Sequence, residues 1–138
     1  MRSYSVNEWI GVAGSGIPPV AVTFFKTGDF SKAGPSEIWI LTEEHPWTID
    51  DGSFEVPWGY GAEGGAWTDF PATRHGMKTP FGFGDGHVEM RKWVDPRTVA
   101  PAKAGVRLPE FVLAPGSEDL MWLARHTTVK TEYGETRP

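Results

Sequence analysis

The stretch from His75 to Trp93, HGMKTPFGFGDGHVEMRKW, predicts a β-hairpin. Asp85 and Gly86 are expected at the two central positions of a type I′ turn, because both positions need a positive φ, which Asp and Gly tolerate best. Folding the chain at this turn places directly opposed residues on the same face of the sheet. The predicted apolar face consists of Phe81, Phe83, Val88 and Met90, and the other face of Gly82, Gly84, His87, Glu89 and Arg91.

The composition of the chain limits the class of protein. At 138 residues the chain is long enough for one core, so we expect a single domain over residues 1–138. Its 17 glycines and 12 prolines predict many turns, short strands and little helix. The net charge of −5, without a basic run, argues against binding to nucleic acid or to an anionic membrane surface. The absence of cysteine excludes disulfides and thiolate metal sites.

Hydrophobic patterns predict further elements around the hairpin. Strands are expected at Val20–Phe25, which is rich in β-branched and aromatic residues, and at Glu37–Thr42, which is apolar on both faces as in a central strand. Ser117 is expected to cap a helix whose core positions begin at Leu120. The predicted fold class is therefore α+β, with a sheet-rich antiparallel domain and a short C-terminal helix.

Five ordered segments of the chain resemble a known family. In the first, His75 and Asp85-Gly86 form an H-x9-DG pattern. The others are Arg2–Trp9 (RSYSVNEW), Glu43–Gly52 (EEHPWTIDDG), Lys92–Thr98 (KWVDPRT) and Leu120–Thr128 (LMWLARHTT). Together they resemble the prepilin-like H-x9-DG proteins of planctomycetes and verrucomicrobia, whose N-termini are of the type II secretion or type IV pilin kind. The chain departs from that pattern at Trp47 and Asp50.

The resemblance implies a pilin-like globular domain with a structural role. We expect a subunit or accessory of an envelope filament or secretion pseudopilus, located in the cell envelope, the periplasm or outside the cell. Its expected partners are other pilin-like subunits, envelope proteins or a second copy, met through an exposed apolar groove. Gly82 and Gly84 would permit close approach on one face of the sheet.

The N-terminus differs from that of a prepilin, which carries a basic leader and a long apolar helix. The longest apolar run, Val20–Phe25, is far shorter than the roughly 20 residues that span a membrane, and no signal peptide is visible. We therefore expect either the separated C-terminal part of such a protein or a relative without the anchor.

Histidines and carboxylates offer a metal site as an alternative function. The candidate ligands for Zn²⁺ are His45, His75 and His87 with Glu44, Asp51 and Asp85. If the Glu-His-Pro loop and the hairpin converge, an open coordination position would activate water for a small metal-dependent hydrolase. The loop that contains Glu43, Glu44, Asp50 and Asp51 is also a candidate for Ca²⁺, with a solvated acidic turn as the simpler interpretation.

Each histidine of the C-terminal half also has a structural interpretation. His75 can hydrogen-bond a loop carbonyl or the Asp85 carboxylate and so hold the hairpin. Asp85-Gly86 is favourable turn chemistry without any further role. His87 is expected to be solvated or packed on the polar face, and His126 to interact with the dipole at the C-terminus of the helix.

Tryptophan is frequent, with seven residues in the chain. Trp39, Trp93 and Trp122 lie on predicted elements and are expected in the core. Trp58 and Trp67 lie in turn-rich sequence, where exposed rings beside acidic side chains would bind sugars or another protein. A glycan-binding module is therefore the second alternative function, unless these two rings fill a core built from loops.

Overall fold

The residues that the structure describes fold into two sheets and one α-helix. The computed structural model describes residues 3–11, 22–56, 65–99 and 112–129. The five-stranded sheet has the strand order β3-β1-β2-β5-β6, and a small sheet pairs β4 with β7. The strands are β1 (Tyr4–Asn7), β2 (Trp39–Glu43), β3 (Ser53–Phe54), β4 (Ala66–Trp67), β5 (Lys78–Phe83), β6 (Val88–Lys92) and β7 (Val112–Leu113). The helices are the 3-10 helix η1 (Thr27–Lys32) and α1 (Glu118–Thr127).

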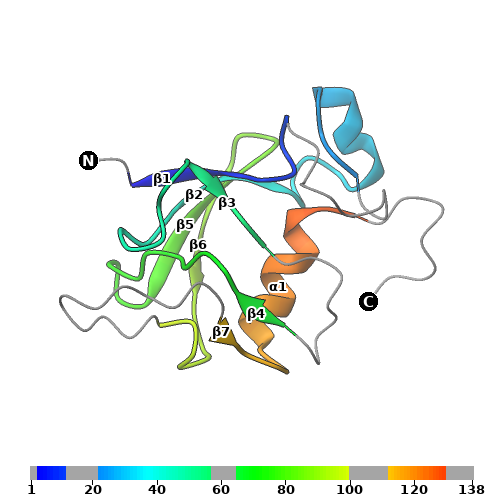
Figure 1. The fold of residues 1–138 in the computed structure, drawn as a ribbon. Helices are drawn as coiled ribbons and strands as arrows, with labels where there is room; N and C mark the ends of the chain where they lie inside the picture. The colour runs from blue at the N-terminus through cyan, green and yellow to red at the C-terminus, as the bar shows by residue number, and fades with distance from the viewer. Residues whose placement is uncertain (1–2, 12–21, 57–64, 100–111, 130–138) are drawn as a thin grey trace.

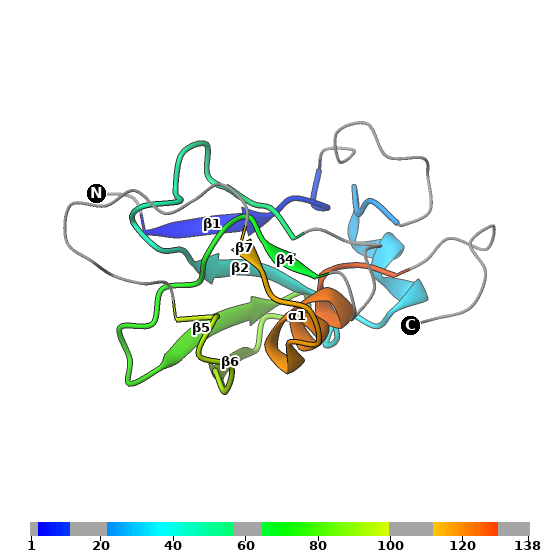
Figure 2. The ribbon, with the colours of Figure 1, turned by 60° about the horizontal axis from the view of Figure 1, so that its bottom comes forward.

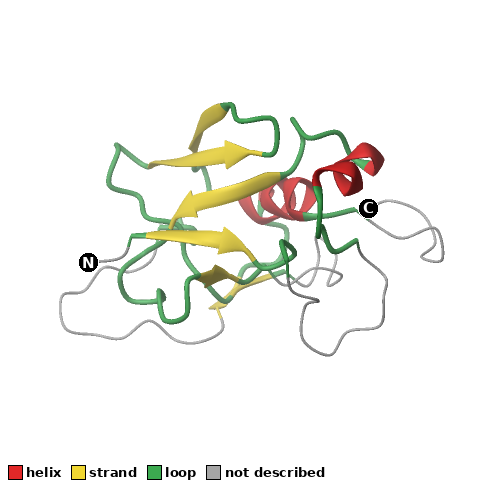
Figure 3. Ribbon diagram, turned by 90° about the horizontal axis from the view of Figure 1, so that it is seen from above, coloured by secondary structure: helices red, strands yellow, loops and turns green. Residues whose placement is uncertain are grey.

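The large sheet forms one layer of the structure, and α1 and the small sheet lie to one side of it (Figure 1). Figure 2 shows β1, β2, β5 and β6 following one another across the sheet, in agreement with the strand order. The two helices lie towards the same end of the sheet (Figure 3). The predicted class, α+β with mostly sheet, is confirmed at this level.

The sheet is mixed, whereas the sequence predicted an antiparallel one. β1 pairs antiparallel with β2 but parallel with β3. The chain reverses direction between β2 and β3, as in a hairpin, so both β1 and β3 run opposite to β2. Because β1 lies between β2 and β3, it pairs with β3 in the parallel direction. The prediction that Glu37–Thr42 contains a central strand is confirmed, because β2 is the middle strand of the order.

The predicted hairpin forms between β5 and β6, but its register is shifted by one residue. Gly86 N–H donates to Phe83 O at 2.9 Å, and Phe83 N–H donates to His87 O at 2.9 Å. The loop therefore has three residues, 84–86, and Gly86 with a φ of 91° closes it as a bulge. The observed pairs are Pro80↔Met90, Phe81↔Glu89 and Gly82↔Val88.

This shift places the four residues of the predicted apolar face on opposite faces of the sheet. Phe81 and Phe83 are buried, whereas Val88 is 66% exposed and Met90 is 49% exposed. The prediction was wrong because Gly84 leaves the hairpin ladder. Its N–H donates to Ile38 O at 3.0 Å, a contact between distant segments that the local pattern does not encode.

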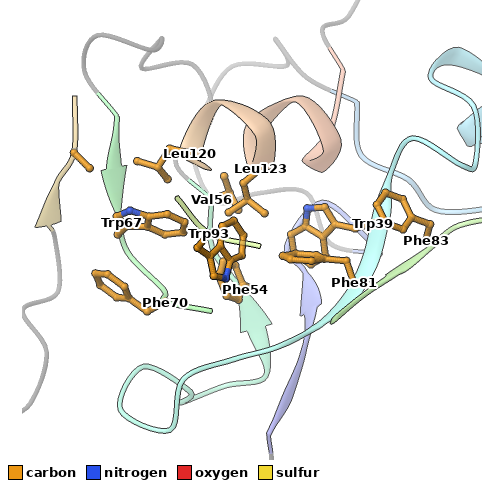
Figure 4. Close-up of a cluster of buried hydrophobic side chains, with 11 residues drawn as sticks. Trp39, Phe54, Val56, Trp67, Phe70, Phe81, Phe83, Trp93, Leu120 and Leu123 are labelled. Atoms are coloured by element: carbon orange, nitrogen blue, oxygen red, sulfur yellow. The ribbon is translucent and has the colours of Figure 1, made fainter. Parts of the chain in front are cut away.

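Aromatic side chains fill the core between the large sheet and α1 (Figure 4). The Trp39 ring meets Phe54 and Phe81 edge-on, with centroid distances of 5.7 and 5.5 Å. The predictions that Trp39 and Trp93 lie in the core are confirmed, and Trp122 packs partly buried against them. The buried members are Trp39, Phe54, Val56, Trp67, Phe70, Phe81, Phe83, Trp93, Ala114, Leu120 and Leu123.

α1 begins where the sequence predicts. The Ser117 side chain accepts a hydrogen bond from the Leu120 N–H at 3.4 Å, as an N-cap residue does. Leu120 and Leu123 then face the core. The predicted docking of this helix through its apolar positions is confirmed.

The strand predicted at Val20–Phe25 is absent from residues 22–25, the part of it that the structure describes. Phe24 makes an isolated parallel bridge with Ile10 and stacks on Phe30 of η1 at a centroid distance of 4.8 Å. With Trp9 and Ile38 these rings form a second apolar cluster. Packing at the end of the sheet thus overrides the β propensity of this segment.

Replacement of Gly84 by Ala should destabilise the fold, because a Cβ atom would lie 2.9 Å from Pro35 O and 3.2 Å from the Phe30 ring. We expect a loss of about 1–3 kcal/mol in the free energy of unfolding, measured by urea denaturation. The matched control is Gly82→Ala, whose nearest neighbour would be 3.8 Å away. Equal losses in both variants would contradict the packing described here.

Candidate functional site

His75 lies away from the hairpin turn. Its Nε2 is 3.2 Å from Glu43 Oε2, and Arg74 Nη1 is 3.3 Å from Glu43 Oε1. These two side chains thereby hold their loop to the end of β2. The prediction of a contact between His75 and Asp85 was wrong, because the turn carboxylate is used by a nearer histidine.

That nearer histidine is His87. Asp85 Oδ1 accepts a hydrogen bond from His87 N–H at 3.0 Å and lies 2.5 Å from His87 Nδ1. These hydrogen bonds hold the pKa of the Asp85 carboxyl below its usual range. The His87 ring stacks on Phe83 at a centroid distance of 4.5 Å. Asp85 and Gly86 therefore build the turn, as expected, whereas His87 packs on Phe83 and not on the face opposite to it, because the register is shifted.

The Glu-His-Pro loop is also joined to the fold. His45 N–H donates to Phe70 O at 2.8 Å, and its Nδ1 accepts from Trp47 N–H at 3.2 Å. Glu44 is buried and accepts from the Ser5 hydroxyl, and burial raises the pKa of its carboxyl. Asp51 Oδ1 accepts from Ser53 N–H at 2.7 Å, which shapes the entry into β3.

The predicted metal ligands do not converge. Within residues 3–11, 22–56, 65–99 and 112–129, no three His, Asp or Glu side chains are grouped to hold a metal ion. The six candidates lie in three places: His75 beside Glu43; His87 and Asp85 at the hairpin turn; His45, Glu44 and Asp51 in the loop after β2. Two of the candidate Ca²⁺ ligands, Glu43 and Glu44, point to opposite sides of the sheet, because successive side chains of a strand alternate. The carboxylate of Glu43 binds Arg74 and His75, whereas that of Glu44 binds Ser5.

Burial strongly raises the pKa of two other carboxyls, those of Glu8 and Asp69. Glu8 Oε1 accepts from Val56 N–H at 2.9 Å, and Asp69 Oδ2 accepts from Glu55 N–H at 2.6 Å. Burial raises the pKa of Glu8 to about 7 and the pKa of Asp69 to about 8, and the Glu55 carboxylate adds to both effects. They flank the chain just after β3 and change charge near neutral pH, a property that the sequence did not reveal.

Trp67 cannot act as an exposed stacking platform in this structure. It is 1% exposed and lies between Phe70 and Trp93, at centroid distances of 5.6 and 6.2 Å. The hypothesis that it binds a sugar was therefore wrong, because the ring completes the core under the small sheet. Trp58, the other predicted stacking residue, lies outside the described residues.

The segment RSYSVNEW supplies a buried tie between elements. Asn7 Nδ2 donates to Trp39 O and to Thr127 O, both at 2.8 Å, and Asn7 Oδ1 accepts from Trp9 N–H at 3.0 Å. Trp39 Nε1 also donates to Thr127 Oγ1 at 3.0 Å. One side chain thus joins β1, β2 and the C-terminal end of α1.

The segment KWVDPRT is held in a similar way by Asp119 of α1. Its Oδ2 accepts from Asp95 N–H at 2.9 Å and from the Thr98 hydroxyl at 2.6 Å, and it lies 3.1 Å from the Val94 nitrogen that donates to it. A hollow beside this junction is lined by Val94, Asp95, Pro96, Arg97, Gly116 and Glu118. Arg97 there is paired with Asp95, at 2.8 Å between Nη2 and Oδ2.

One side of the large sheet carries a set of exposed apolar residues. Registers across the strands place Val6, Leu41, Gly82 and Val88 in one row. Tyr4 and Met90 lie on the same side, two positions along their strands. We call this set the open face: Tyr4, Val6, Leu41, Val88 and Met90, of which Tyr4 is 50% and Leu41 41% exposed. Several neighbouring exposed apolar residues on one sheet are typical of an interaction surface.

The signature histidine lies at the border of the open face. Glu43, which binds His75 and Arg74, pairs with Tyr4 across β1 and β2. Lys78 and Lys92 pair across β5 and β6 and are both exposed. The open face therefore has an apolar centre and a basic end.

Comparisons with known proteins add no relative: no family model, no curated protein and no solved structure matches this chain. The described residues contain no helix long and apolar enough to cross a membrane.

Asn7 and Asp119 were missed by sequence reasoning, and so was the open face. Short polar residues next to aromatic ones, as in Asn7-Glu8-Trp9, are a weak signal for a buried tie. The open face was missed because the predicted two-residue turn places Val88 and Met90 on the same face as Phe81 and Phe83, in the core. A three-residue turn closed by Gly86 would have exposed them.

Replacement of Asn7 by Ala should cost about 2–4 kcal/mol of unfolding free energy, because it leaves buried carbonyls of β2 and α1 without their donor. Replacement of His75 by Ala should cost less than about 1 kcal/mol, because its contact with Glu43 is about half exposed on the histidine side. Chemical denaturation of both variants checks this order, and a larger loss for His75→Ala would contradict it.

The unfolding free energy should fall as the pH rises from 5 to 8. Glu8 and Asp69 keep their protons in the folded state up to pH about 7 and about 8, but lose them near pH 4 when unfolded. The folded state thus binds more protons than the unfolded state in this window. The unfolding free energy is therefore higher at low pH and decreases until the pH passes the folded pKa of each group. In the variant Glu8→Gln/Asp69→Asn, we expect stability relative to the parent to increase by about 1–2 kcal/mol from pH 5 to 8. A difference that does not change with pH would contradict these pKa shifts.

Proposed function

We propose that this domain is a structural subunit of a pilin-like or pseudopilin-like envelope assembly, and that it meets its partners through the open face. The observation that carries the proposal is the open face itself. Five apolar side chains from β1, β2 and β6 lie exposed on one side of the sheet, beside a basic end.

The use of the signature residues supports a structural rather than a catalytic role. Asn7 and His75 bind distant parts of the chain, at Thr127 and Glu43, whereas Asp85 and Asp95 bind residues of their own turns, at His87 and Arg97. Residues whose described contacts are internal serve the fold itself, as a structural role requires. The chemistry left accessible on the sheet is apolar contact area, which is what an assembly subunit needs.

The chemistry of the open face also defines the partner. An apolar centre requires an apolar surface opposite, and the exposed ammonium groups of Lys78 and Lys92 favour carboxylates beside it. An envelope polypeptide with an amphipathic, partly acidic face fits this description. The envelope location follows from the resemblance to H-x9-DG prepilin-like proteins and is part of the proposal.

Two other functions have less geometric support. The metal-dependent hydrolase needs ligands that lie in three separate places in the described chain. The glycan-binding module needs exposed rings, and Trp67 is buried. A stoichiometric transition metal in protein purified without a tag or added metal would reverse this ranking.

A photo-crosslinking residue at position 41, in cells that produce the protein, tests the proposal. We expect adducts between position 41 and an envelope polypeptide, because Leu41 lies at the centre of the open face. Phe25 is the matched control, since it is an exposed apolar residue that belongs to none of the strands. Mass spectrometry of the adduct identifies the partner. No adduct at position 41, or equal yields at positions 41 and 25, would contradict the proposal.

A further inference from the structure

The outer edge of β6 has the geometry of a pairing strand. β6 is the last strand of the order and pairs with β5 on its inner side. Phe83 N–H donates to His87 O and Trp93 N–H donates to Met77 O, so the backbone groups of His87 and Trp93 point towards β5. Because this orientation alternates, the backbone groups of Val88, Met90 and Lys92 point away from β5. No described residue pairs with them as a neighbouring strand.

We propose that β6 pairs antiparallel with β6 of a second copy of this chain, about a two-fold axis at Met90. This inference rests on the proposed function, since it names a second copy of the chain as one partner in that assembly, met at the strand edge beside the open face. In this register Met90 lies opposite Met90 of the other copy, and Val88 lies opposite Lys92. All three residues have outward backbone groups, so each pair would exchange two hydrogen bonds.

Charge favours this register over its neighbours. Pairing about Met90 places Glu89 of one copy opposite Arg91 of the other, on both sides of the axis. Pairing about Glu89 would oppose two carboxylates, and pairing about Arg91 would oppose two guanidinium groups. Opposite charges across a strand pair stabilise it and like charges destabilise it. The sequence Val88-Glu89-Met90-Arg91-Lys92 is therefore self-complementary in one arrangement.

Contacts with α1 order the Arg91 side chain of β6. Its guanidinium lies over the Trp122 ring, 4.8 Å from the centroid, and its Nη2 is 3.7 Å from Asp119 Oδ1. Glu89, by contrast, is about half exposed, and its Oε1 lies 3.9 Å from His87 Nε2 of the same strand region. The pair would also join the open faces of two copies into one continuous apolar surface, because Val88 and Met90 lie on it.

The oligomeric state of the full chain, measured by sedimentation velocity over a range of concentrations, tests the inference. We expect a reversible dimer. Glu89→Arg should weaken it at least tenfold by opposing two positive charges, and Met90→Pro should abolish it by removing the central N–H. The charge-matched control is Glu55→Arg, which lies beyond β3 at the opposite edge and should leave the dimer unchanged. Circular dichroism and thermal unfolding of each variant confirm that it folds.

Cysteine variants test the register. The chain contains no cysteine, so Met90→Cys introduces a single thiol whose Cα would lie about 5.5 Å from its symmetry mate. Val88→Cys would lie about 13 Å from its mate along the strand. We expect a short thiol cross-linker to join copies of Met90→Cys much faster than copies of Val88→Cys.

The outcomes separate this inference from the proposed function. A chain that stays monomeric at all concentrations, or a dimer that Glu89→Arg and Met90→Pro leave intact, overturns pairing through β6. Equal cross-linking at positions 88 and 90 overturns the register. Adducts at position 41 in cells would still support the open face as an assembly surface in any of these cases.

Discussion

The position of α1 against the sheet depends on the buried amide of Asn7. This side chain donates to the backbone of β2 at Trp39 and of α1 at Thr127, while its oxygen accepts from Trp9 N–H. Buried carbonyls need a donor, so the two elements can approach only where the amide satisfies both. Trp39 and Thr127 add a second bond between the same elements. The aromatic core closes around this junction.

Each end of α1 is therefore bound through a polar contact. At its C-terminal end, Asn7 supplies the donor, and at its N-terminal end, Asp119 accepts from the segment that follows β6. The helix covers one side of the sheet between these two points. The opposite side keeps the open face, where residues of β1, β2 and β6 remain exposed. The same contacts that order the core thus decide which side of the sheet can meet a partner.

Much of the fold could be predicted because its signals are local. The Ser117 cap, the Asp85-Gly86 turn and the apolar run of β2 each depend on neighbours in the sequence. The register of the hairpin could not be predicted, because it depends on the bond between Gly84 N–H and Ile38 O. Likewise, the partner of His75 is Glu43, 32 positions away. The open face depends on the same register and could not be predicted either. The predicted convergence of His45, His75 and His87 failed because it depends on contacts between segments far apart in the sequence.

Hydroxyl-radical footprinting tests the central claim, that the fold buries its aromatic core and leaves the open face for a partner. Tyr4 and Met90 report on the open face, Trp67 and Trp93 on the core, and Met77 on the exposed position just before β5. We expect Tyr4 and Met90 to react in dilute purified protein and to be protected in the intact cell envelope, with Met77 reactive in both and the two tryptophans unreactive in both. Equal reactivity of Tyr4 and Met90 in the two states, or reaction of Trp67 as fast as Tyr4, would contradict the account.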